Sequence, residues 1–286
     1  MDLPKEYTLR RSFFREVMII KKKVVIRTIR PFGKGGKILT CLVIIAVLLV
    51  GFYLLFPEVA RPVLNYASGR LVPIYYVETN DKKVAFSFDA CWGAAYTPTL
   101  LEILKENNIQ TTFFLTGFWV EKYPEMVKTI AEEGHEIGNH TYSHPHLNSL
   151  AEGQIKVELE KVGQMILELT GVEPHLFRPP FGEYSNKTIS AIEKCGYQTI
   201  QWSIDSLDWK ELGKGPMVER VKENLHPGAI ILFHNNGTYT AEALPEIIEF
   251  IKGEGYEILP ISELLYKENY YIDSNTGAQI LKPNKG

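Results

Sequence analysis

The chain has 286 residues, 45% of them hydrophobic, which is enough for one large domain or two small ones with a sizeable core. Its net charge of −3 hides an asymmetry, because residues 1–37 carry 11 Lys or Arg against 3 Asp or Glu, a net +8 that leaves −11 for the remainder. The acidic remainder excludes an extended phosphate-binding surface, so we do not expect nucleic-acid binding.

The apolar run 38–56 is expected to cross a membrane. As a helix, its 19 residues would span about 28 Å, close to the hydrocarbon thickness of a bilayer. A removable signal peptide is the alternative, but its apolar region would be shorter and a small-residue cleavage site would follow. With the basic flank inside, we expect a single-pass cell-membrane protein with a cytoplasmic N-terminus and an extracytoplasmic domain.

The composition divides the chain into five segments. They are a basic cytoplasmic segment 1–37, a transmembrane anchor 38–56, a stalk 57–81, a globular domain 82–265 and a polar C-terminal tail 266–286. Strand-like and helix-like patterns alternate through the globular domain. The strand-like runs are Val84–Asp89, Thr111–Thr116, Glu136–Asn139, Leu176–Arg178, Gln198–Ile204, Ala229–His234 and Glu257–Pro260. The helical patterns are Thr99–Asn107, Tyr123–Glu133, Ala151–Thr170, Asn186–Lys194, Pro216–Asn224 and Ala241–Gly253.

Seven strands separated by crossovers predict parallel pairing and an α/β fold. We expect a distorted (β/α)7 barrel, and a doubly wound open sheet is the alternative. Polar residues at or just past the carboxyl ends of the strands favour the barrel, because catalytic groups collect at that rim. These residues are Asp89, His140, Arg178, Asp205, Asp208 and His234.

His140 and His144 have a spacing that suits a divalent metal such as zinc. If they follow a strand into a turn or short helix, residues i and i+4 share a face, and two imidazoles there are natural ligands. The alternative is two surface or hydrogen-bonded histidines. Asp89 directly follows an apolar strand and therefore needs a cation, a hydrogen-bond donor or a catalytic role. Its alternative is to cap the next helix.

Arg178 precedes two prolines and is placed to hold a carboxylate in a bidentate contact, or to form a purely structural salt bridge. His234 ends an apolar strand, and a histidine with an aspartate nearby is a natural proton donor near neutral pH. Its alternative is a hydrogen-bonded core histidine. Asp205 and Asp208 are available to orient His234 or Arg178. Trp209 offers an apolar wall for a sugar, or it simply packs in the core.

Taken together, five motifs in this order resemble those of the NodB-type polysaccharide deacetylases, carbohydrate esterase family 4. They are Phe88-Asp89, His140-Thr141-Tyr142-Ser143-His144, Arg178-Pro179-Pro180-Phe181-Gly182, Asp205-Ser206-Leu207-Asp208-Trp209 and Leu232-Phe233-His234. The resemblance covers residues 82–265, and the anchored arrangement is most similar to sporulation-associated members.

The resemblance implies a metal-dependent hydrolase that removes N-acetyl groups from a cell-wall or chitin-like polysaccharide, with peptidoglycan as the expected substrate. No sequence feature indicates an obligate protein partner. It assigns His140 and His144 as metal ligands, with zinc as the expected ion, and Asp89 as the general base held by Arg178. It further assigns His234 as the general acid tuned by Asp208, and Pro180, Phe181, Trp209 and Leu232 as substrate-binding residues, with a backbone N–H near Phe181 facing the oxyanion.

Position 90 departs from the family pattern. The first motif usually reads Asp-Asp, with the second carboxylate as a metal ligand, whereas this chain has Ala90 followed by Cys91. Three outcomes follow: a more weakly held metal on the two histidines, a replacement ligand from Asp89 or Cys91, or a glycan-binding pseudoenzyme without metal. We expect the first, because Cys91 is one position out of register and its side chain should point elsewhere.

Overall fold

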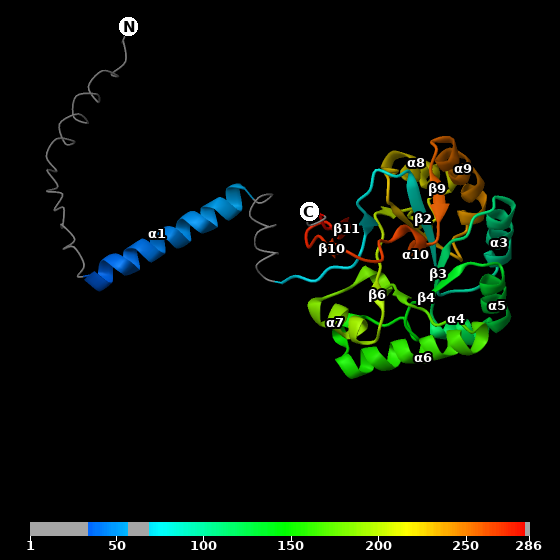
Figure 1. The fold of residues 1–286 in the computed structure, drawn as a ribbon, viewed down its shortest axis with the longest axis horizontal. Coiled ribbons are helices and arrows are strands. Elements are labelled where there is room, and N and C mark those ends of the chain that lie inside the picture. Colours follow the sequence, from blue (N-terminus) through cyan, green and yellow to red (C-terminus); the bar gives the residue numbers. More distant parts are fainter. Residues whose placement is uncertain (1–33, 57–68, 284–286) are drawn as a thin grey trace, which may run out of the picture. The chain divides into compact units, whose positions relative to one another are not determined.

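The computed structural model describes residues 34–56 and 69–283 (Figure 1). In the first range, α1 (Lys34–Leu55) is an apolar helix of 22 residues. Its segment Ile38–Leu55 is long and apolar enough to cross a membrane, and no other helix in the described ranges meets that test. The predicted basic segment lies almost wholly outside the described residues, as does the first part of the predicted stalk.

The second range is built on an eight-stranded parallel sheet. Its strands are β2 (Lys83–Ala90), β3 (Thr112–Leu115), β4 (Glu136–Asn139), β5 (Leu176–Phe177), β6 (Gln198–Thr199), β7 (Ile204–Asp205), β8 (Ile230–His234) and β9 (Glu257–Leu259). The strand order is β6-β5-β4-β3-β2-β8-β7, with β9 paired to the beginning of β2. The predicted α/β fold is confirmed as a curled, half-barrel sheet of the (β/α)7 type.

The run 198–204 was expected to be one strand, but the structure divides it. Its first part is β6 and its end is β7, and these two strands lie at opposite ends of the strand order. The backbone N–H of Ile200 donates to Phe177 O at 2.8 Å, whereas that of Ser203 donates to Ile230 O at 3.0 Å. One short segment therefore passes from one edge of the curled sheet to the other.

Helices pack around the outside of the curled sheet (Figure 1). They are α3 (Thr97–Glu106), α4 (Gly117–Lys122), α5 (Pro124–Glu132), α6 (Glu152–Thr170), α7 (Asn186–Lys194), α8 (Lys214–Asn224), α9 (Thr240–Gly253) and α10 (Ile261–Leu264). The six predicted helices are confirmed, and the short α4 and α10 were not predicted. Phe86, Phe88 and Ala90 of β2 are fully buried in the core cluster that includes apolar residues of α3 and α9. Alternate residues of β2 therefore face the helices.

A second, three-stranded sheet has the order β1-β11-β10. Its strands are β1 (Tyr76–Val77), β10 (Tyr270–Ile272) and β11 (Ala278–Leu281). This differs from the expected stalk and polar tail, because β1 lies in the predicted stalk and the other two lie in the predicted tail. The buried Gln279 stabilises the arrangement through two hydrogen bonds to the backbone of Tyr266, of 2.8 and 3.0 Å. The runs are too short for a clear periodic pattern.

Candidate active site

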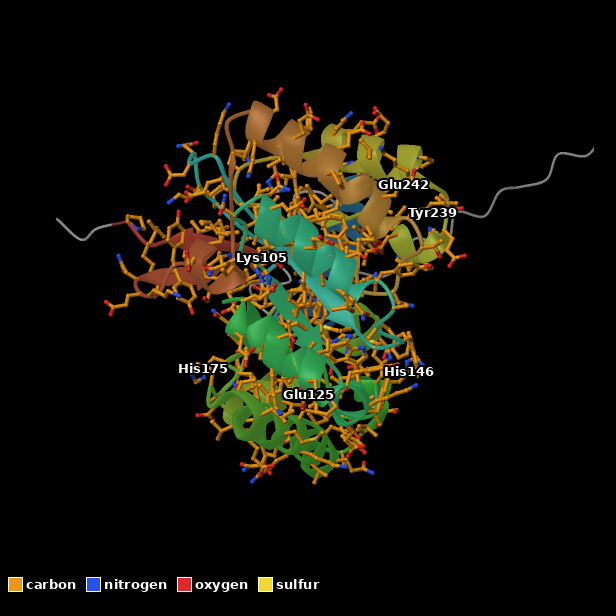
Figure 2. The ribbon with its side chains drawn as sticks, turned by 90° about the vertical axis from the view of Figure 1, so that its right-hand side faces the viewer. Lys105, Glu125, His146, His175, Tyr239 and Glu242 are labelled. Carbon is orange, nitrogen blue, oxygen red and sulfur yellow. The ribbon has the colours of Figure 1, made fainter. Side chains whose placement is uncertain are left out.

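The loops that follow the strands collect on one side of the sheet. Figure 2 places His146, which follows β4, and Tyr239, which precedes α9, on the side opposite Lys105 and His175. On the strand-end side lies a cavity of about 610 Å³. Of the residues assigned to the site from sequence, Asp89, His140, His144, Phe181, Asp205, Asp208, Trp209, Leu232 and His234 line it. Pro180 is buried and does not line the cavity, whereas its neighbour Pro179 does.

Asp89 and His234 lie side by side because their strands are in register. β2 and β8 are parallel neighbours, and Asp89 is the register partner of His234. Side chains at paired positions of adjacent strands point to the same face. Two residues 145 positions apart in the chain therefore present a carboxylate and an imidazole to one cavity.

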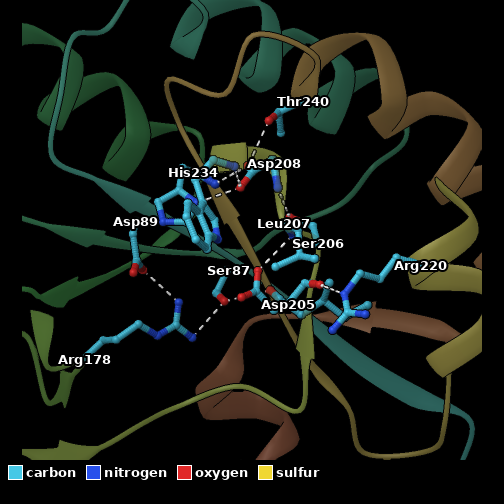
Figure 3. Close-up of polar contacts among 12 residues, drawn as sticks. Ser87, Asp89, Arg178, Asp205, Ser206, Leu207, Asp208, Arg220, His234 and Thr240 are labelled. Atoms are coloured by element: carbon cyan, nitrogen blue, oxygen red, sulfur yellow. Dashed lines mark hydrogen bonds and ion pairs between the residues drawn. The ribbon is translucent and has the colours of Figure 1, made fainter. Parts of the chain in front are cut away.

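Arg178 contacts Asp89 and holds its carboxylate in place (Figure 3). The fully buried guanidinium donates from Nη1 to Asp89 Oδ1 at 2.8 Å, and from Nη2 to Ser87 Oγ at 2.9 Å and Gln201 O at 3.1 Å. Its central carbon also lies 4.3 Å from the Phe114 ring centroid, a cation–π contact. Burial by itself raises the pKa of Asp89, but the charge and hydrogen bond of Arg178, together with the charges of His140 and His234, outweigh it and leave that pKa below its ordinary value. Asp89 is thus ionised near neutral pH.

His234 is coupled to Asp208, which is itself 1% exposed. Asp208 Oδ1 accepts from His234 Nδ1 at 2.7 Å, and its Oδ2 accepts from the His234 backbone N–H at 2.6 Å and the Thr240 hydroxyl at 2.9 Å. Burial lowers the pKa of His234, but the hydrogen bond and charge of Asp208 reverse this and leave the pKa above its ordinary value. His234 therefore carries its proton at a pH where Asp89 has lost its own, which is the arrangement of an acid–base pair.

Asp205 has a different role from Asp208, although the sequence offered both to orient the same groups. Its carboxylate accepts from the Leu207 backbone N–H at 2.9 Å, and its carbonyl accepts from Arg220 Nε at 2.7 Å (Figure 3). It forms no hydrogen bond with Arg178 or His234 among the described residues. Asp205 shapes the turn that carries Asp208 to His234.

The two metal-ligand candidates meet at the same cavity. The ring centroids of His140 and His144 are 5.0 Å apart. Burial and the neighbouring His140 lower the pKa of His144 to about 4, so its ring is neutral at pH 7, the form that binds a metal. His144 also has a left-handed φ of 56°, a strained conformation for a residue with a side chain. The fold therefore holds the His144 imidazole in place at some energetic cost.

The donor set around His140 fits a cation. Its Nδ1 lies 2.6 Å from Arg178 O, and because a carbonyl only accepts, Nδ1 must carry the proton and Nε2 the lone pair. That lone pair lies 3.6 Å from Asp89 Oδ2, another acceptor. Two acceptors facing each other at this distance suit a positively charged group between them. The sulfur of Cys91 lies within 4.8 Å of the ligand atoms of both histidines.

The expectation that Cys91 points away from the site is wrong. Cys91 lines the cavity together with Asp89, whereas Ala90 is fully buried in the core on the other face of β2. The alternation of side chains along a strand explains this, because positions 89 and 91 share a face. The site therefore lies on the face of position 91 and not on the face of position 90.

Exposed aromatic rings surround the cavity. Phe181 is 57% exposed and stacks on His146, with ring centroids 4.3 Å apart, while Trp209 is 56% exposed. Phe181 lies in the segment Pro180–Gly182 with a left-handed φ of 58°. Trp92 and Trp202, which were not predicted, also line the cavity. Flat apolar rings around a polar floor suit the faces of sugar rings.

Sequence reasoning missed two residues that hold the charged groups. Ser87 accepts a hydrogen bond from Arg178 and donates to Ile231 O at 2.8 Å. A signal was available, because Ser87 is two positions before Asp89 and must share its face. Thr240, which donates to Asp208, had no such signal because it begins a helix 32 positions away.

Residues 76–200 match the protein-family model described as Polysaccharide deacetylase. The peptidoglycan-N-acetylmuramic acid deacetylase PdaA of Bacillus subtilis is 34% identical over 222 residues, covering 76% of this chain and 84% of that protein. A peptidoglycan-N-acetylglucosamine deacetylase of Bacillus cereus is 36% identical over 194 residues, covering 66% and 91%. The matched range 76–200 contains Asp89, both candidate ligand histidines and Arg178, and His234 lies beyond it.

Solved structures of carbohydrate esterase family 4 proteins are also similar to this chain. A carbohydrate esterase family 4 pseudoenzyme from Bacillus anthracis superposes with a TM-score of 0.66 at 36% identity, covering 68% of each chain. The structure of Bacillus subtilis PdaA gives a TM-score of 0.64 at 35% identity, covering 67% of this chain and 84% of that one. These proteins resemble the chain in both fold and amino-acid sequence.

Proposed function

The chain belongs to the polysaccharide deacetylase family, carbohydrate esterase family 4, and we propose that it is a metal-dependent hydrolase that removes N-acetyl groups from peptidoglycan. The pairing of Asp89 with His234 carries the proposal. These register partners have pKa values displaced in opposite directions, which suits one to accept a proton and the other to donate one at the same pH. The relatives named as peptidoglycan deacetylases support the substrate class.

His140 and His144 would hold the ion, and zinc fits two imidazoles. A divalent ion there would polarise the acetyl carbonyl and lower the pKa of the attacking water. The remaining chemistry belongs to the chain's own residues. Asp89 takes a proton from the water as its oxygen adds to the carbonyl carbon, and Arg178 keeps that carboxylate ionised and fixed in direction.

Collapse of the tetrahedral adduct breaks the carbon–nitrogen bond. His234 donates its proton to the departing nitrogen, so that the products are acetate and a sugar with a free amine. Asp208 maintains the proton on His234 before this step. A backbone N–H near Phe181 would stabilise the oxyanion. Leu232 and Trp209 line the cavity and would contact the acetyl group and the sugar ring.

Location follows from α1. We propose that this helix anchors the protein in the cell membrane, with the basic N-terminal segment in the cytoplasm and the deacetylase domain outside, where peptidoglycan lies. A role in sporulation stays a prediction of the resemblance. Deleting the coding sequence and comparing spore yield and germination with vegetative growth tests that role.

A second candidate function is glycan binding without catalysis. Two observations favour it: Ala90 replaces the usual ligand carboxylate, and one similar structure is of a pseudoenzyme. Measuring zinc content together with acetate release from N-acetylglucosamine oligomers separates the two functions. An enzyme loses acetate release on Asp89→Asn and still binds the oligomer. A binder releases none before or after the substitution, and the exposed Asp81→Asn is the matched control.

A further inference from the structure

We propose that Cys91 is the third protein ligand of the metal, so that the site is a Cys-His-His centre rather than the weak two-histidine centre expected from sequence. The inference rests on the proposed function, because it names a ligand of the same site. Cys91 is 7% exposed and its sulfur, with one ring nitrogen each from His140 and His144, forms a triangle with all sides within 4.8 Å.

The geometry needs only small movements to bind an ion. In a tetrahedral zinc site with Zn–N of about 2.0 Å and Zn–S of about 2.3 Å, ligand atoms lie about 3.3–3.6 Å apart. The upper limit of 4.8 Å on the present separations exceeds this by about 1.2–1.5 Å. Rotation of the Cys91 and His144 side chains covers such a difference without moving the backbone, while His140 keeps its contact with Arg178 O.

The end of β2 directs Cys91 toward the site. Both the backbone N–H and the hydroxyl of Thr116 donate to Ala90 O, each at 3.2 Å, and this keeps position 90 in the sheet. Ala90 is consequently packed in the helix-side core, and position 91 faces the cavity. A carboxylate at position 90 would face the core in this geometry, so the chain supplies its third ligand one residue later.

His140 is already oriented as a ligand. Arg178 O fixes the proton on His140 Nδ1, and a backbone carbonyl in this position is a common outer partner of metal-binding histidines. Binding would break the S–H bond of Cys91, release that proton to solvent and form a sulfur–metal bond, with no change in oxidation state. One thiolate and two neutral imidazoles favour zinc or cobalt over magnesium or calcium.

A buried thiol with only a packing role is the competing explanation. A disulfide is not a competing explanation, because Cys91 and Cys195 are both free in the described chain. Cys195 caps the end of α7 and provides a matched control, since it is a second thiol on a different element.

The test is a cobalt titration of the purified full chain in detergent, stripped of metal and kept reduced with a phosphine. Bound Co²⁺ should give visible ligand-field bands and a near-ultraviolet thiolate-to-metal charge-transfer band. Cys91→Ser should abolish the charge-transfer band and weaken zinc binding at least ~10-fold, the scale on which even outer partners act. Cys91→Asp should restore zinc binding without the band, and Cys195→Ser should change neither.

The wild-type spectrum lacking the charge-transfer band, or keeping it in Cys91→Ser, would overturn the proposal. Circular dichroism of each variant identifies misfolding, and the Cys91→Asp variant provides a second folded comparison. These readouts do not depend on catalysis. The band without acetate release would leave the ligand assignment standing and remove the proposed function. Metal-dependent acetate release without the band would leave the proposed function standing and overturn the assignment of Cys91 as a ligand.

Discussion

Replacing Asp208 with Asn should move the alkaline limb of the pH–rate profile to lower pH. Asp208 raises the pKa of His234 across a 2.7 Å hydrogen bond. Two unit charges about 4 Å apart interact by about 4 kcal/mol at an effective dielectric of 20. The His234 side chain is 24% exposed, so solvent screening reduces this value. We therefore expect the alkaline limb to move to lower pH, by less than this unscreened interaction energy corresponds to.

The direction of the change in the His234 pKa follows from the protonation state of His234 that Asp208 stabilises. Its charge favours protonated His234, so its removal lowers the pKa of the acid and reduces the protonated fraction at pH 7. Loss of general-acid function should reduce kcat/KM about 10²–10⁴-fold above the new pKa. The Asn amide also places a donor against the backbone N–H of either His234 or Trp209, which should cost about 1–3 kcal/mol of stability.

The assay is acetate release from peptidoglycan by the full chain between pH 5 and 10, with melting temperatures recorded in parallel. Asp205→Asn is the matched control, because it removes a carboxylate from the same rim that forms no hydrogen bond with His234. Its alkaline limb should shift less. An unchanged profile in a folded Asp208→Asn protein would refute the assignment of His234 as the acid.

Three further predictions concern the supporting structure. Arg178→Met leaves the buried Asp89 carboxylate unpaired and should lower the free energy of unfolding by about 3–5 kcal/mol. Adding Asp89→Asn should recover part of this loss. An unchanged urea midpoint for Arg178→Met would contradict the prediction. Ala90→Asp places a charge in the apolar core and should lower the melting temperature, whereas a rise in zinc affinity would show that position 90 reaches the site. Burial lowers the pKa of His135 to about 4, and its Nδ1 accepts from the Thr111 N–H. The histidine therefore takes up a proton at a higher pH in the unfolded chain than in the folded protein. Up to about 3 kcal/mol of stability should be lost as pH falls from about 6.5 to about 4. His135→Asn should flatten that dependence of stability on pH, measured by urea titrations at several pH values.

The positions of the main polar groups could be predicted because each ends an apolar run. Asp89 is the last residue but one of β2 and His234 is the last residue of β8, both strands are strongly apolar, and parallel pairing brings such ends together. Spacing alone made His140 and His144 a candidate metal pair. The family resemblance supplied the pairing of Arg178 with Asp89, which composition alone left open.

Other features depend on details that a single sequence does not express. The direction of Cys91 is set by how far β2 continues, and Thr116 fixes this through hydrogen bonds across 26 positions. The division of the run 198–204 between two sheet edges leaves strands of two residues each, too short for any periodic signal. The contact of Thr240 with Asp208 depends on where α9 begins.

The most direct test of the central claim is acetate release from peptidoglycan by the purified full chain, before and after removal of bound metal with a chelator. The account predicts release that stops on chelation, returns with zinc and is lost in Asp89→Asn while Asp81→Asn remains active. A folded protein that binds the glycan but releases no acetate with any divalent ion would contradict it.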